Sequence, residues 1–411
     1  MKTKLVRILV ALAMSTTIAH AAQPFIATAR STDSGPPVTL TAEGGNFFNF
    51  LSTLVQKEGQ FQALDNRAFA GDMTFLGLTS AIQYVTNGVG NQITINLAPI
   101  GFSRTFSAAT REEVDDQLED FFEKEGAETI AEFLKAVAKG SPIAVTDGNP
   151  TSATALAASS TFTGQGFTSS DELSDGADGG SKPKFGGLSF GLNSGTFEAG
   201  IFEGTTFDFS GTLFSFGGDT VRVVLPFNLN YLKLDGGSQV GGFGLSAVLP
   251  IRFKKMNKEN PLNWRVTPLA GVSVRGSMDL ASVSPLWNAG LINTVDYRLS
   301  PKLVLSMVNQ LTVHKSIGIA YDDLDFDPQV DQQILKNGLR VSTPASRRVT
   351  LDGFVIDTRF LKDAAIDQFW TIGASLAFRA TQRWNVVLGL NYDTGDNFNA
   401  YSVGITSAWK W

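Results

Sequence analysis

The chain has 411 residues, with 33 Lys and Arg against 39 Asp and Glu, and it contains no cysteine. The absence of cysteine excludes thiol enzymes and disulfide scaffolds, and a net charge of −6 disfavours non-specific binding to nucleic acid. With 41 glycines, 31 phenylalanines and only 18% charged residues, the composition favours a β-protein. A mean hydropathy of +0.04 is too low for a helical membrane protein, which leaves a soluble β-protein or a membrane β-barrel.

The first residues have the order of a secretory signal peptide. Lys2, Lys4 and Arg7 form a basic start, a short apolar stretch follows, and Ala19-His20-Ala21 is a small-residue cleavage site. We therefore expect residues 1–21 to be removed on export.

Residues 22–163 predict a mixed α/β segment. An amphipathic stretch covers 46–57, and β-like runs at 81–86 and 92–106 are joined by a turn of hairpin length. Residues 164–186 are rich in Gly and Ser, which predicts a flexible linker.

Residues 110–139 predict a kinked helix or helical hairpin with an acidic face and a break at Gly126. Its apolar stripe must be covered, because a helix of this length is marginal alone in water. Two locations are open: a plug in a basic pore, against Arg265, Arg275 or Arg379, or a small periplasmic domain formed with residues 45–75.

From residue 187 to the end of the chain, apolar residues alternate with polar, small or basic ones. The runs are 9 to 14 residues long, roughly the length of a tilted strand that crosses a bilayer. Aromatic residues fall near the ends of the apolar faces, as expected for the two membrane interfaces. The candidate interface residues are Trp264, Trp287, Trp370, Trp384, Trp409 and Trp411.

These features resemble the outer-membrane β-barrel proteins of Gram-negative bacteria over residues 187–411. The last strand, which ends at Trp411, is similar to the C-terminal signal that the outer-membrane assembly machinery reads. The resemblance implies an all-β membrane barrel in contact with outer-membrane lipid, with a periplasmic C-terminus. Counting gives about 12 antiparallel strands, or 14 if the 81–106 hairpin joins the wall, and short turns predict the periplasmic end.

The polar face of the predicted strands is mainly basic. Charged residues on the lipid face are costly, so the same parity directs these side chains into the lumen. The candidate selectivity residues are Arg222, Arg252, Arg265, Arg275, Arg298 and Arg379.

Two further sets of residues suggest chemistry. His314, the one histidine of the mature chain, lies on the polar face of its predicted strand, but the sequence around it shows no recognisable Ser-His-Asp arrangement. The loop acids Asp322, Asp323, Asp325 and Asp327 resemble a weak cation site without the spacing of an EF-hand. We therefore expect neither an enzyme nor a cofactor.

The sequence thus predicts an outer-membrane barrel, and its basic lumen suggests a passive channel for small polar or anionic solutes. Two alternatives remain: a non-conducting barrel with a structural or surface-binding role, and a secreted soluble β-rich binding protein.

Overall fold

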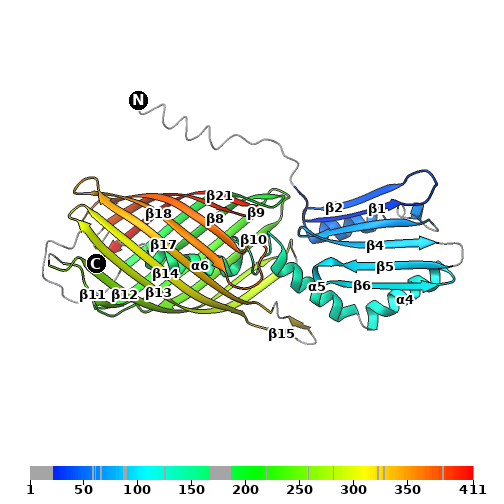
Figure 1. Ribbon diagram of the computed structural model, residues 1–411, viewed down its shortest axis with the longest axis horizontal. Coiled ribbons are helices and arrows are strands. Elements are labelled where there is room, and N and C mark those ends of the chain that lie inside the picture. The colour runs from blue at the N-terminus through cyan, green and yellow to red at the C-terminus, as the bar shows by residue number, and fades with distance from the viewer. Residues whose placement is uncertain are drawn as a thin grey trace, which may run out of the picture.

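The computed structural model divides into an N-terminal domain and a β-barrel (Figure 1). It describes residues 22–57, 60, 62–64, 67–86, 90–124, 126–166, 187–218, 220–257, 259–280, 282–321, 324–326, 329–381 and 384–410. The expected signal peptide and most of the expected linker lie outside these residues. Within them, no helix is long and apolar enough to cross a bilayer.

The N-terminal domain is a six-stranded antiparallel sheet with the order β2-β1-β3-β4-β5-β6. One face carries Tyr84, Ile93 and Ile95, which are buried, and the helices pack on this face. The strands are β1 (Phe25–Ser31), β2 (Thr39–Gly44), β3 (Phe69–Phe75), β4 (Leu78–Thr86), β5 (Asn91–Leu97) and β6 (Phe102–Ala108).

Three helices cover the sheet. In α2 (Phe47–Gln56) the Asn46 side chain caps the first turn by accepting from Asn49 N at 2.8 Å. Thr110 and Glu113 form a reciprocal capping box at the start of α4 (Arg111–Lys124). Helix α5 (Gly126–Gly140) follows the break, as the sequence predicts. The 3-10 turns η1 (Gln62–Leu64) and η2 (Ala98–Ile100) complete the domain.

The second part of the chain is a closed barrel of twelve antiparallel strands, because β10 pairs with β12 and closes the sheet. Pro250 lies between β10 and β11, which together form one wall strand. The strands are β7 (Gly187–Ala199), β8 (Phe202–Gly217), β9 (Arg222–Leu234), β10 (Gln239–Val248) with β11 (Ile251–Lys254), β12 (Leu262–Ser277), β13 (Ser282–Ser300), β14 (Leu303–Ser316), β17 (Asp331–Pro344), β18 (Val349–Phe360), β19 (Gln368–Arg379), β20 (Trp384–Gly395) and β21 (Phe398–Lys410). A short hairpin of β15 (Ile319–Tyr321) and β16 (Leu324–Phe326) lies between β14 and β17.

The prediction of a twelve-stranded antiparallel barrel is confirmed, with two corrections. The sequence pattern predicts first strands at 196–204 and 206–216 with a turn at 205, but the first turn lies at Gly200, whose φ of +60° suits glycine. The 81–106 hairpin belongs to the N-terminal sheet and not to the wall, so the fourteen-strand alternative is wrong.

We call the end of the barrel with Gly187 and Lys410 the base, and the opposite end the mouth. The short links that the sequence predicts at 216–219, 299–302, 343–346 and 380–383 correspond to the turns after β8, β13, β17 and β19, which all lie at the base. The mouth also has turns as short as 200–201 and 396–397, so turn length alone does not distinguish the two ends.

The N-terminal domain is docked on the mouth through one continuous apolar core. This core joins Phe25 and Phe75 of the domain to Phe202, Phe360 and Phe398 of the barrel. Hydrogen bonds also cross the junction, since Phe47 N donates to Asp279 O at 2.7 Å and the Ser238 hydroxyl donates to Gly45 O. The domain is therefore a lid integrated with the barrel and not a loosely tethered unit.

Candidate functional site

The lumen contains a helix of the protein's own chain. Helix α6 (Ala153–Gly166) lies inside the barrel (Figure 1) and packs mainly against β13, with further contacts to β9, β12, β14 and β17. Its small residues Ala155 and Ala158 are 1% exposed, and Phe162 is fully buried among inward side chains of the wall. Small side chains let a helix fit within twelve strands, whose lumen is narrow.

Residues 141–152, here called the mouth loop, lead from α5 into α6. Asn149 is the centre of this loop: its side-chain amide donates to Ala144 O at 2.8 Å, and its Oδ1 accepts from Thr151 N and the Thr151 hydroxyl. The Thr154 hydroxyl donates to Asp147 Oδ1 at 2.7 Å. Asn149 and Asp147 are almost fully buried. These bonds therefore satisfy polar groups whose burial without a partner would make this loop conformation unfavourable.

Side chains of the wall hold this segment in place. Arg275 Nη1 donates to Thr151 O, Gln310 Nε2 donates to Ala158 O at 2.8 Å, and Lys336 Nζ donates to Ser159 Oγ at 2.8 Å. The Lys336 ammonium also lies 5.6 Å from the centre of the Phe162 ring, a cation–π geometry. These three inward side chains are therefore partners of the mouth loop and α6, here together called the plug, and not a bare pore lining.

The structure does not bring the six predicted selectivity arginines together. Arg275 contacts the mouth loop near the mouth. The other five lie toward the base, where Arg222 starts β9, Arg379 ends β19, and Arg298 donates to Asn257 O at 2.9 Å. Arg252 and Arg265 are register partners between β11 and β12.

Lys336 and Arg340 are inward cations of β17 that the sequence reasoning missed, and both are buried. They have the opposite parity to Leu339 and Val341, which are exposed on the outer face. The alternation along this strand could therefore have identified both cations as inward. Arg340 donates to Ser306 Oγ at 2.9 Å, and its guanidinium lies 3.8 Å from Asp296. Register pairing places the acids Asp208, Asp352 and Asp393 on inward positions as well, so the lumen carries both signs of charge.

His314 is fully buried in the wall, where its Nε2 lies 2.9 Å from the Thr312 hydroxyl. Its register partners are Asn288 and Gln332, so neither neighbouring strand places a carboxylate or serine directly beside it. Of the loop acids, Asp325 lies in β16, whereas Asp322, Asp323 and Asp327 lie outside the described residues.

The helical segment 110–139 does not fill the pore. Helix α4 packs on β5 and β6, with Val114 and Phe121 in the domain core, and Phe133 of α5 lies in the junction core. The plug placement of this segment is therefore wrong, and the lumen holds α6 in its place.

Five of the predicted interface tryptophans point away from the lumen, with exposed fractions from 37% for Trp384 to 43% for Trp409. Trp264, Trp384 and Trp409 lie near the base, and Trp287 and Trp370 lie nearer the mouth. Trp411 lies outside the described residues. Leu388, Leu390 and Val403 are more than half exposed between the two levels, which gives the barrel an apolar outer belt.

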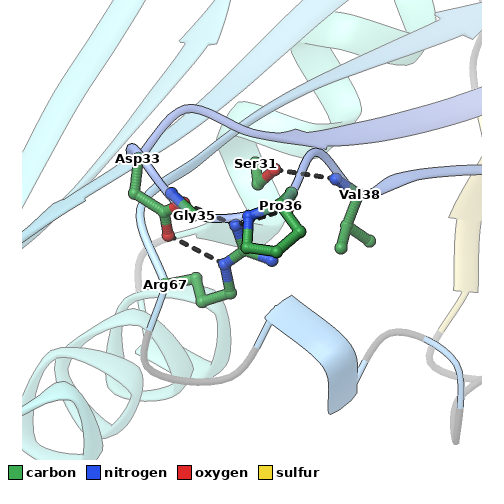
Figure 2. Close-up of polar contacts among 6 residues, drawn as sticks. All are labelled: Ser31, Asp33, Gly35, Pro36, Val38 and Arg67. Atoms are coloured by element: carbon green, nitrogen blue, oxygen red, sulfur yellow. Dashed lines mark hydrogen bonds and ion pairs between the residues drawn. The ribbon is translucent and has the colours of Figure 1, made fainter.

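The connection between β1 and β2 at the far tip of the domain is ordered by a clamp (Figure 2). Arg67 Nε donates to Asp33 Oδ2 at 2.8 Å, and Arg67 Nη2 donates to Asp33 Oδ1 and to Pro36 O. Gly35 N also donates to Asp33 Oδ1 at 3.0 Å. The bond from Arg67 lowers the pKa of Asp33 to about 2.

We expect Arg67→Ala to increase amide hydrogen exchange in residues 32–38. Because the pKa of Asp33 is lowered on folding, the protection from this pair is complete above its ordinary pKa of 3.8 and is lost as the pH falls through about 2. The difference between wild type and variant should therefore be constant from pH 7 to about pH 4 and then shrink. Arg30→Ala, which removes a more exposed pair with Asp72, is the control and should leave this exchange unchanged.

No known family model matches the chain, and no curated protein matches it by sequence. Among solved structures, it is similar to the translocator domain of the autotransporter NalP from Neisseria meningitidis, with 13% identity and a TM-score of 0.40 over 58% of this chain and 92% of that one. It is also similar to the β-domain of the Bordetella autotransporter BrkA, with 13% identity and a TM-score of 0.42 over 56% and 100%. The NanC porin shows 11% identity and a TM-score of 0.37 over 54% and 100%.

The closed antiparallel wall, the apolar outer belt and the polar interior define an outer-membrane β-barrel protein. A soluble barrel would not expose such a belt to water. The barrel is porin-like in architecture, with an N-terminal domain as its lid.

Proposed function

We propose that this protein is a closed outer-membrane barrel that anchors and displays its N-terminal domain at the cell surface. The observation that carries the proposal is the path of the chain. It leaves the lid on the mouth, passes through the mouth loop, and continues as α6 inside the lumen toward the base, where β7 begins. The plug thus links the displayed domain to the wall through the pore.

The orientation follows from the base. The resemblance to outer-membrane barrels implies a periplasmic C-terminus, and Gly187 pairs with Lys410 at the same end. The mouth and its lid would then face the exterior. The β1–β2 tip, with its exposed Ser34, would then lie away from the membrane (Figure 1).

Cysteine labelling of whole cells tests this orientation, because the natural chain has no cysteine. We expect Ser34→Cys to react with a membrane-impermeant maleimide on intact cells. Ser346→Cys, exposed in the turn after β17 at the base, is the matched control and should react only after the outer membrane is permeabilised. The reverse pattern would refute display at the surface.

A passive channel for small polar or anionic solutes stays a prediction. The inward cations Arg265, Lys336 and Arg340 favour it, whereas the plug and the inward acids oppose it. In planar bilayers we expect the full-length protein to show no conductance steps, and steady anion-selective steps would favour the channel. The proposal assigns His314 a structural role and requires no cofactor.

A further inference from the structure

The five turns at the base carry a ring of cations. The basic residues in or beside them are Arg222 at the start of β9, Lys254 at the end of β11, Lys255 after β11, Lys302 after β13, Arg347 and Arg348 after β17, and Arg379 at the end of β19. All except Arg379 are exposed. Among the described residues of these turns, Glu259 is the single acid. Four of the five turns around the base therefore contribute exposed positive charge.

The mouth has the opposite balance. The exposed charged residues at or beside its turns are the acids Glu198, Glu203, Asp235, Asp331, Asp363, Asp367 and Asp396, against the cations Lys233, Lys315, Arg359 and Lys362, among the residues that the structure describes. The charge is therefore separated along the barrel axis, although the chain as a whole has a net charge of −6. Solubility alone does not require such a separation, because mixed surface charge serves it equally well.

The cations of the base directly border the apolar outer belt. Lys254 is the register partner of Trp264, whose ring lies 4.9 Å from that of the exposed Phe253. Along the barrel axis toward the base, aromatic side chains are followed by Lys and Arg. This order matches a bilayer, in which the charged headgroups lie beyond the level of the interfacial aromatic residues.

We infer that this ring binds the phosphate groups of anionic phospholipids in the leaflet around the base. The continuity of the ring with the lipid-facing belt identifies the occupant as a lipid headgroup, and the excess of cations over acids at the base selects an anionic one. Long Lys and Arg side chains reach headgroups while their stems stay in contact with the interface. This inference does not depend on which side of the membrane the base faces, so it can fail without affecting the proposed display function.

Lipid binding to the purified full-length protein tests the inference. We expect native mass spectrometry in detergent to show retention of dioleoyl phosphatidylglycerol in preference to dioleoyl phosphatidylcholine. The variant Arg347→Gln/Arg348→Gln should bind phosphatidylglycerol about fivefold more weakly for each removed cation. Both side chains are exposed and their turn is held by backbone bonds, including Ala345 N to Val349 O at 2.9 Å, so the barrel should fold.

The matched control is Lys233→Gln/Lys315→Gln, which removes two exposed cations near the mouth. It should retain phosphatidylglycerol like the wild type, and heat-modifiable gel mobility should show that all proteins are folded. Equal binding of the two lipids, or equal losses in the base and mouth variants, would overturn the inference. Unchanged binding in the base variant would overturn it as well.

Discussion

Removal of residues 23–166 should convert a closed barrel into a conducting one, whereas removal of residues 23–140 should leave it closed. Both variants lack the lid, so they differ only in the mouth loop and α6. In planar bilayers we expect discrete conductance steps from the larger deletion and none from the smaller. The reason is that α6 and the mouth loop occupy the lumen from Ser141, fully buried at the mouth, to Phe162, fully buried among wall side chains.

The emptied barrel should remain folded, because the wall is a complete ring of backbone pairs that does not include α6. Water can replace Thr151 O, Ala158 O and Ser159 Oγ as partners of the wall. Because Asp208 and Asp393 share the lumen with Lys336 and Arg340, the open pore should discriminate weakly between anions and cations. A closed larger deletion, or an open smaller one, would show that α6 is not the plug.

The wall strands were predictable because each one separates lipid from a polar interior, and this boundary imposes a period of two on the sequence. In β12, Val272 and Val274 face outward while Arg275 is buried inward, as the alternation predicts. Helices α2, α4 and α5 were predictable for a similar reason, since each has one face on the domain and one in water.

Helix α6 could not be found in this way. It is surrounded by the barrel, so Ala155, Ala157 and Ala158 are all buried and no polar face develops. The alternation of side chains also does not show how far along the barrel axis a residue lies. It placed Arg275 and Arg298 in one lumen-lining set, although the first contacts the mouth loop and the second lies at the base. The charge separation between base and mouth therefore emerges only from the register of the strands.

Substitution of Phe202 by alanine should detach the lid from the barrel. Phe202 is 2% exposed and lies in the core that joins the domain to the mouth. A Cβ at Gly77, in the turn between β3 and β4, would lie only 2.9 Å from its ring, so domain and barrel meet here without space between them. Loss of a buried Phe side chain costs about 3–5 kcal/mol, and we expect this loss to fall on the docking of the lid.

Urea unfolding in detergent, followed by two signals, can measure this effect. All six tryptophans lie in the barrel sequence, at residue 264 or later, so their fluorescence reports on the wall, whereas far-ultraviolet circular dichroism also reports on the domain. Phe202→Ala should shift the dichroism transition to lower urea and leave the fluorescence transition in place. Phe207→Ala, on the same strand but 44% exposed on the outer face, should change stability by less than about 1 kcal/mol. If Phe202→Ala left both transitions unchanged, the apolar junction would not be what holds the lid on the mouth.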